Sequence, residues 1–306
     1  MKNLYLAFWK AQKSKTNKIA VKNFRRGLSE NLKNLVADFL DNNVKMGKYS
    51  YFTIYDTKER TICAASFRER VIQHAVMNIC DEVFEKYQIY DSYACRKGKG
   101  VDVCLKRTVY FCRKFKWYLK LDVHKYFDSI DHDILFRLLC RKFREPDLLK
   151  FFFDLIESYE IEKNKGIPIG NLLSQYFANM YLAVLDHELK ERLRLKGYVR
   201  YMDDFICFAD DKKTLKELYF WIENFLHKEL SLELNKMQLN RCLNGIPFLS
   251  YRVYPYGLRL SLKAKHRYKT KIKEANMIMD ADREIFKNND LRTKLFYLLS
   301  IFSKIP

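Results

Sequence analysis

The chain has 306 residues, 48% of them hydrophobic, so it can bury one large core or the cores of two to three subdomains. Its 57 Lys and Arg residues outnumber 37 Asp and Glu residues, and the net charge of +20 favours a polyanionic partner such as nucleic acid over a merely soluble basic surface. No apolar run reaches the roughly 20 residues of a membrane span, and the N-terminus lacks a signal-peptide core, which argues against membrane and secreted proteins.

The cysteine content indicates a reducing compartment. None of the eight cysteines belongs to a Cys-x-x-Cys pair, so we expect reduced, mostly buried thiols of a cytoplasmic protein. This pattern disfavours a zinc site or a disulfide framework. With 9 Gly and 5 Pro, the chain also has little room for long linkers.

The first 65 residues predict two helical stretches followed by two strands. Residues 1–28 predict a short helix and a connector, and residues 29–43 predict a helix. Residues 48–55 alternate as a strand does, and Thr61–Ala65 predicts a second strand.

A capping box opens the next helix, because Ser66 is followed three residues later by Glu69. A packed or surface role is expected for His74 in this helix. A predicted core-facing stripe runs along it through Val71, Ala75, Ile79 and Val83. The basic segment Arg96–Gly100 that follows fits a solvated turn as well as a nucleic-acid contact, and residues 101–115 predict a helix.

An acidic residue ends the next strand, Trp117–Val123. Burying Asp122 there without a partner is costly, so this carboxylate requires a cation. Helices are predicted at about 131–142 and 146–158. A turn at 166–170 then begins a long helix that reaches about Arg194.

A second acidic feature lies at the tip of a predicted hairpin, Tyr201-Met202-Asp203-Asp204. Adjacent carboxylates repel each other unless a cation is present, and Mg²⁺ prefers carboxylate oxygens. Taken alone, the motif also fits an ordinary surface turn. Together with Asp122 it suits two-metal phosphoryl transfer, in which carboxylates from adjacent strands bridge two ions. A helix at 213–228, a strand at 248–254 and a basic helical C-terminus from residue 263 complete the chain.

Five sequence blocks between about residues 50 and 260 resemble those of a reverse transcriptase, and they stand in that family's order. These blocks are Lys58-Glu59-Arg60 (fingertip), Leu121-Asp122-Val123 with Tyr126-Phe127-Asp128 (first palm motif), Gly166–Gly170 with Ser174-Gln175 (start of a template- and nucleotide-contacting helix), Tyr201–Asp204 (catalytic hairpin) and Phe248–Arg252 (primer grip).

This resemblance implies an α+β, right-hand polymerase fold. It places fingers at 1–115 and a palm, with an antiparallel sheet and helices, at 116–260. A fingers insertion is expected at 131–165, and a short helical thumb at 261–306.

The resemblance also implies a role for each acid. Asp122 and Asp203 would ligate two Mg²⁺ ions, for which Mn²⁺ could substitute, while Asp204 would support the site more indirectly. Val123 belongs to the same metal-binding stretch. Asp128 and Asp131 are expected to cap and orient the local backbone instead.

The remaining implied roles concern substrate. Arg60 and Lys58 would neutralise the nucleotide triphosphate, and Phe127 would exclude ribonucleotides, with core packing as its alternative. Ile169, Gly170 and Gln175 would contact the nucleotide, and Leu249, Ser250, Tyr251 and Arg252 would form the primer grip. Lys236 stands one position early for the family's leaving-group lysine, so a general acid and a surface lysine remain alternatives.

The segment from Ile169-Gly170 to Ser174-Gln175 differs from the Q-G-x-x-x-S-P of most reverse transcriptases and resembles diversity-generating retroelements. This resemblance implies a bacterial or phage-encoded enzyme that copies a template-repeat RNA into cDNA with errors opposite adenines. Ile169 and Arg60 are hypothesised to set its fidelity. Implied partners are template RNA, the RNA–DNA hybrid, deoxynucleotides and a small basic helical accessory protein. Alternatives are a retron, phage-defence or intron-type reverse transcriptase, or a non-enzymatic RNA-binding scaffold.

Overall fold

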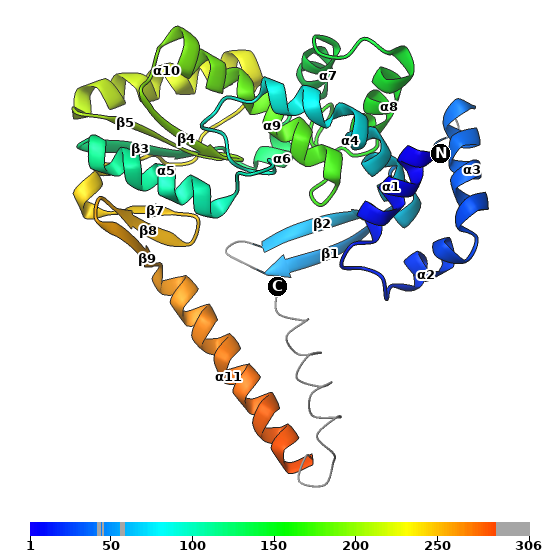
Figure 1. Cartoon of the computed structure of the whole chain (residues 1–306). Coiled ribbons are helices and arrows are strands. Elements are labelled where there is room, and N and C mark those ends of the chain that lie inside the picture. The colour runs from blue at the N-terminus through cyan, green and yellow to red at the C-terminus, as the bar shows by residue number, and fades with distance from the viewer. Residues whose placement is uncertain (42–43, 45, 56–58, 286–306) are drawn as a thin grey trace.

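A computed structural model of the chain describes residues 1–41, 44, 46–55 and 59–285. Its centre is an antiparallel sheet in the order β4-β5-β3-β6, built from β3 (Trp117–Asp122), β4 (Gly197–Tyr201), β5 (Asp204–Ala209) and β6 (Gln238–Arg241). The β4–β5 hairpin and the acidic end of β3 therefore lie side by side, as the sequence predicts (Figure 1).

Both faces of this sheet are buried, because alternate side chains of its strands enter two different cores. Leu119 and Phe205 pack into the larger core, which includes α9 (Leu172–His187) and α10 (Lys212–Leu230). Tyr118 and Phe208 pack into a second core with α5 (Val101–Lys114) and the sheet formed by β7 (Ile246–Phe248), β8 (Tyr251–Tyr254) and β9 (Gly257–Leu260). The sheet is therefore rigidly held between layers, which fixes the position of its acidic edge.

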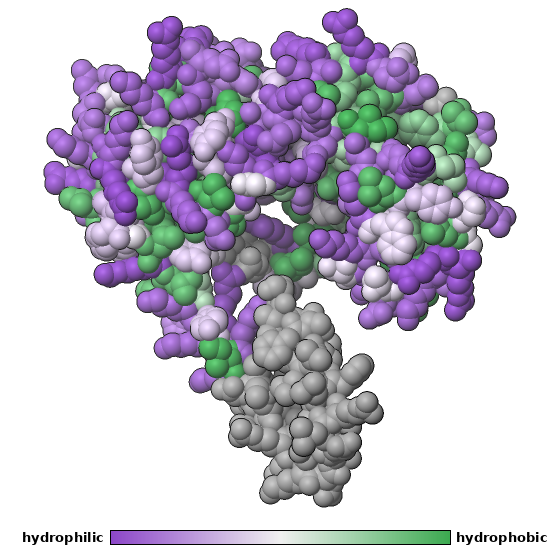
Figure 2. Space-filling model, in the orientation of Figure 1, coloured by the Kyte–Doolittle hydropathy of each residue, from purple (hydrophilic) through white to green (hydrophobic). Residues whose placement is uncertain are grey.

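A second group of elements packs around α4 (Phe67–Tyr87). The hairpin β1 (Tyr49–Tyr55) and β2 (Glu59–Ala65) precedes it, and α6 (Tyr126–Ser129), α7 (His132–Cys140) and α8 (Pro146–Glu157) follow β3. The N-terminal residues form α1 (Lys2–Gln12), α2 (Ile19–Arg26) and α3 (Leu28–Leu40), so the first 28 residues contain two helices where one was predicted. Figure 2 shows a mostly hydrophilic surface, which is hollowed between this group of elements around α4 and the part of the molecule that contains the central sheet.

The predicted core-facing stripe of α4 is correct at Val71 and Ala75, which are buried, and at Val83, which is partly buried against the core, but wrong at Ile79, which is 72% exposed. A row of residues four apart slants around a helix of 3.6 residues per turn, so Ile79 points away from the face on which Val71 and Ala75 are buried. The core face continues instead through Cys80 and Phe84.

Only one half of the predicted capping box is observed. Ser66 accepts a hydrogen bond from the Glu69 amide at 3.2 Å, whereas the Glu69 carboxylate is buried and accepts one from Gln73 Nε2 at 3.2 Å. The Gln73 side-chain oxygen in turn accepts hydrogen bonds from the first amides of α9, at Leu172 (3.1 Å) and Leu173 (3.5 Å). Glu69 thus belongs to an internal polar chain that links α4 to the start of α9.

Glu69→Gln is expected to reduce the loss of stability between pH 5 and pH 8. Burial raises the pKa of Glu69 from 4.5 to about 7, so the folded protein prefers the neutral acid. Its contribution is fully present below pH 4.5 and is lost as pH rises through 7. A neutral amide removes this dependence, and the Tm of the variant at pH 8 should exceed that of wild type by roughly 3 °C. Equal pH profiles of Tm would contradict this reading.

The basic segment Arg96–Gly100 is a structural turn in which every cation contacts protein groups. Arg96 pairs with Glu85 at 2.6 Å, and Lys97 pairs with Asp81. The Lys99 ammonium lies 3.7 Å from the centre of the Tyr90 ring. These contacts favour the solvated-turn interpretation of the segment.

The C-terminal part has more strands than the single one predicted, since β6 and β9 were not expected. The predicted strand 248–254 is correct for Phe248 and 251–254 but is not continuous, because the chain reverses at Leu249-Ser250 between β7 (Ile246–Phe248) and β8 (Tyr251–Tyr254). Both turn residues have positive φ, 47° and 69°, as a tight hairpin turn requires. The third strand of this sheet is β9 (Gly257–Leu260), after which α11 (Leu262–Ile285) extends away from the sheet (Figure 1).

The expectation for the cysteines agrees with the structure. All eight cysteines are free thiols, and only Cys95 and Cys140 are exposed. None of the helices in the described ranges is long and apolar enough to span a bilayer.

The helix predicted to reach about Arg194 is α-helical only as far as His187. A π-helical turn, η1 (Glu188–Arg192), follows it directly.

Candidate active site

The structure brings three aspartates together at one edge of the central sheet. Asp122 is the last residue of β3, and it lies opposite Asp204, the first residue of β5, in the antiparallel register. Asp203 precedes Asp204 in the hairpin turn, and its carbonyl accepts a hydrogen bond from the Val123 amide at 3.3 Å. The backbones of Asp122 and Asp203 therefore lie side by side in the folded chain.

Electrostatics at this edge are unfavourable for carboxylates alone. Burial, opposed by Lys120 and assisted by Asp122 and Asp203, raises the pKa of Asp204 to about 7. The Lys120 ammonium lies 2.9 Å from Asp204 Oδ1 and offsets part of this repulsion. Asp204 is thus paired with Lys120 within the protein.

Asn235 is a site residue that sequence reasoning missed. Its Nδ2 donates to Asp122 Oδ2 at 2.8 Å, its backbone amide donates to the Asp122 carbonyl at 2.8 Å, and its Oδ1 contacts His124 Nδ1 at 3.0 Å. An isolated bridge between Val123 and Leu234 places the segment beside the end of β3. The neighbouring Lys236 is exposed. The sequence signal that could have indicated Asn235 is its position directly before Lys236.

The predicted nucleotide-contacting turn is clamped between two elements. The Ile169 carbonyl accepts a hydrogen bond from the Cys63 amide of β2 at 2.7 Å, and the Ile167 amide donates to the Phe127 carbonyl at 2.8 Å. Gly170 has φ +111°, and a Cβ there would lie 2.6 Å from Ile62 Cγ2. The structure thus places Ile169 and Gly170 against β2 and connects the same turn to Phe127.

The other predicted substrate residues lie around this turn. Arg60 is exposed on β2, while Lys58 lies outside the described residues. Phe127 is half-buried and packs edge-to-face on Tyr126, with ring centres 5.8 Å apart. Gln175, on the first turns of α9, accepts a hydrogen bond from the Cys95 thiol at 3.1 Å.

Two acids near Phe127 were predicted to cap the backbone. Asp131 caps α7 by accepting a hydrogen bond from the Ile134 amide at 2.9 Å, as predicted. The helix that contains Asp128, α6, begins after Lys125 without a side-chain cap, and burial raises the pKa of Asp128.

The predicted primer-grip residues form the turn between β7 and β8 and the start of β8. Leu249 is half-buried against the second core, and Ser250 and Arg252 are exposed. The Ser250 carbonyl accepts a hydrogen bond from the Ser261 amide at 3.0 Å. Ser250 therefore joins the turn to the segment that begins α11.

Residues 45–269 match the family model described as "Reverse transcriptase (RNA-dependent DNA polymerase)". The chain belongs to the reverse transcriptase family. Among curated relatives, the COX1/OXI3 intron 1 protein of Saccharomyces cerevisiae is 23% identical over 46% of this chain and 18% of its own length. The Group II intron-encoded protein LtrA of Lactococcus lactis subsp. cremoris is 27% identical over 42% of this chain and 22% of its own length.

The fold agrees with this membership. The structure of telomerase from Candida albicans in complex with the TWJ fragment of telomeric RNA superposes with a TM-score of 0.53. It covers 76% of this reverse transcriptase-family chain and 51% of the telomerase chain, at 13% identity. The expected α+β, right-hand polymerase class is confirmed. The matches to the two curated relatives span 18% and 22% of those longer proteins.

Proposed function

We propose that this protein is an RNA-directed DNA polymerase that extends a DNA primer on a template RNA. The observation that supports the proposal is the register of β3 and β5, which sets Asp122 beside the Asp203-Asp204 turn in a reverse transcriptase-family chain. Fingers at 1–115 with the 131–165 insertion, a palm at 116–260 and a thumb from 261 are the domains that we assign.

Reverse transcriptases use divalent metal ions, and the residues at this edge fit two Mg²⁺ ions. Their donors are hard carboxylate oxygens, and burial, together with the charges of Asp122 and Asp203, raises the pKa of Asp204, so a cation at this place would stabilise the ionised carboxylates. Among the described residues, no three His, Cys, Asp or Glu side chains form a metal-binding group by themselves. One or two carboxylates commonly hold Mg²⁺ together with substrate phosphates, so Asp122 and Asp203 would be enough to hold it once substrate is bound.

Asp122 and Asp203 would hold the ions, with the backbone of Val123 adjoining them. Bound metal would activate the primer 3′-hydroxyl and stabilise charge on the transferred phosphorus. Asn235 orients the Asp122 carboxylate, and Lys120 balances the charge of Asp204. Arg60 and Lys58 would neutralise the triphosphate, and Phe127 would select deoxynucleotides by excluding a 2′-hydroxyl.

Primer extension on an RNA template with Mg²⁺ and deoxynucleotides tests the proposal. Wild-type protein should incorporate nucleotides, alone or with a small basic accessory protein, and omission of Mg²⁺ should abolish incorporation. Mn²⁺ should restore activity in place of Mg²⁺. Failure of the wild type to extend any primer, with or without the accessory protein, would favour the scaffold alternative.

We further propose that the enzyme serves a diversity-generating retroelement and copies a template-repeat RNA with errors opposite adenines. The supporting observation is the Ile169…Gln175 sequence, since isoleucine cannot hydrogen-bond near the nucleotide as glutamine can. The curated relatives instead favour an intron-type enzyme. Misincorporation measured separately at the four template bases distinguishes these readings. Equal, low error rates at all four bases would reject the retroelement assignment.

Asn235→Ala is expected to lower the rate of primer extension by about 10- to 100-fold, because a hydrogen bond to a charged group is worth roughly 1.5–3 kcal/mol. The backbone contact of residue 235 to Asp122 remains in this variant, so its Tm should change little. Asn240→Ala on β6 is a matched control, because it removes an exposed amide whose oxygen accepts hydrogen bonds from the Arg241 amide and from Asn244, and it should leave the rate unchanged. A wild-type rate for Asn235→Ala would exclude Asn235 from the site.

A further inference from the structure

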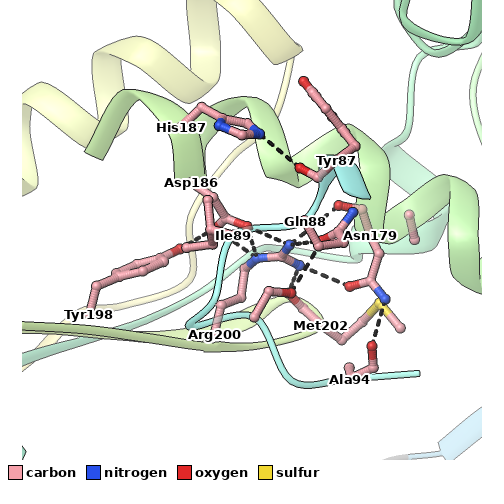
Figure 3. Close-up of polar contacts among 12 residues, drawn as sticks. Tyr87, Gln88, Ile89, Ala94, Asn179, Asp186, His187, Tyr198, Arg200 and Met202 are labelled. Carbon is pink, nitrogen blue, oxygen red and sulfur yellow. Dashed lines mark hydrogen bonds and ion pairs between the residues drawn. The ribbon is translucent and has the colours of Figure 1, made fainter. Parts of the chain in front are cut away.

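A fully buried ion pair joins strand β4 of the β4–β5 hairpin to α9 (Figure 3). The side chains of Arg200, on β4, and Asp186, on α9, are both 0% exposed. Arg200 Nε donates to the two Asp186 oxygens at 2.8 and 2.9 Å, and Nη2 donates to Oδ2 at 2.6 Å. Burial lowers the pKa of Arg200, but the charge and hydrogen bonds of Asp186 outweigh burial and raise the net pKa, so the guanidinium stays charged.

Stability alone does not explain why the hairpin contains this charge. Apolar residues of similar volume often replace a buried ion pair without loss of stability. The other donors of the guanidinium have a more specific use. Nη1 donates to Asn179 Oδ1 and to the Met202 carbonyl, both at 3.0 Å, and Nη2 donates to Gln88 Oε1 at 3.1 Å. Arg200 therefore connects α9 and the end of α4 to the hairpin turn.

The Met202 carbonyl is the part of the turn next to the proposed metal ligand. Met202 has φ +57°, a left-handed conformation that a residue with a side chain adopts at a cost. Its carbonyl belongs to the peptide bond between Met202 and Asp203, so a charged group that donates a hydrogen bond to this oxygen fixes the backbone position of Asp203. The backbone of Arg200 is held as well, since its amide donates to the Asp91 carbonyl at 2.9 Å and its carbonyl accepts from Tyr93 at 3.0 Å.

We propose that Arg200, held by Asp186, is a positioning residue that keeps the Met202-Asp203 turn in the geometry needed for catalysis. The proposal deepens the polymerase function and rests on it for its kinetic consequence. Its structural consequence, a turn that is held closed by the guanidinium, does not depend on the reaction. The two consequences can be measured separately.

Arg200→Lys tests the proposal, because one ammonium group cannot serve both Asp186 and the Met202 carbonyl as the planar guanidinium does. We expect kcat for primer extension to fall about 10- to 100-fold while KM for deoxynucleotides changes less than about 3-fold, as a small misplacement of a catalytic group predicts. Hydrogen–deuterium exchange of the backbone at 201–204 should become faster.

Tyr198→Phe is the matched control. It removes a 2.7 Å hydrogen bond to Asp186 from the same buried network but leaves the guanidinium contact with Met202 in place. Its Tm should fall, while its kcat and its exchange at 201–204 should match wild type. If Arg200→Lys behaves like Tyr198→Phe in both readouts, Arg200 has only a general structural role and the proposal is overturned.

Two further outcomes are distinguishable. An inactive wild type would defeat the polymerase proposal, and exchange at 201–204 would still decide the role of Arg200. If Arg200→Lys fails to fold, the double variant Arg200→Met/Asp186→Leu removes both charges and preserves apolar volume. A folded double variant with the same loss of kcat supports the proposal, and a folded, fully active one overturns it.

Discussion

Asp203→Asn is expected to lower the rate of primer extension by about 1,000-fold or more, because it removes a carboxylate that the reaction needs for its metal ions. The side chain keeps its size and loses its charge. Since Asp203 contributes to the raised pKa of Asp204, its neutralisation relieves repulsion at this edge. The Tm should therefore stay constant or rise, which separates loss of chemistry from loss of folding.

Asp210→Asn provides the control for this substitution. Asp210 is exposed and directly follows β5, whereas Asp203 directly precedes it. Asp210→Asn therefore makes the same chemical change at the opposite end of the same strand. Its rate should stay within about 2-fold of wild type, as for most surface substitutions. Substantial activity in Asp203→Asn, or an equal loss in both variants, would refute the assignment of Asp203.

Gly170→Ala is expected to lower the free energy of unfolding by roughly 2–5 kcal/mol, because it combines backbone strain with overpacking. This is the largest loss of stability that we predict for any of the variants. Gly170 has φ +111°, and the added Cβ would approach Ile62 Cγ2 to 2.6 Å and the Cys63 carbonyl to 3.4 Å. The turn would separate from β2, which carries Arg60, so KM for deoxynucleotides should also rise. Thermal unfolding and nucleotide titration measure the two effects.

Gly98→Ala isolates the backbone part of this cost. Gly98 also has positive φ, +68°, but a Cβ there would meet no atom within 4 Å. We expect Gly98→Ala to lower the free energy of unfolding by about 1 kcal/mol, as is usual for an alanine in the left-handed conformation. Equal losses for the two variants would show that the contact with Ile62 has no importance.

The parts of the site that the sequence predicts are those set by strand periodicity. Asp122 ends an apolar run and Asp203-Asp204 interrupt another, so antiparallel pairing of the two strands places the acids together. The reversal at Leu249-Ser250 could not be predicted in this way. Tight turns with two positive φ values usually contain Asn or Gly, and neither is present.

The supporting contacts were missed for a different reason. In the sequence, nothing distinguishes Arg200 from the other cations of a basic chain, and its partner Asp186 looks like a polar residue at the end of a helix. Only the packing of α9 against the sheet shows that both are fully buried. Asn235 likewise reaches Asp122 from a segment after α10, whose path no local pattern specifies.

The most direct test of the central claim is Mn²⁺ binding, measured by electron paramagnetic resonance on protein with template–primer and a non-incorporable nucleotide. If Asp122 and Asp203 share the metal ions, wild type should bind Mn²⁺ tightly, and Asp122→Asn and Asp203→Asn should each weaken binding by about 10-fold or more. Asp210→Asn should bind as wild type does. Equal Mn²⁺ affinity in all four proteins would contradict the account.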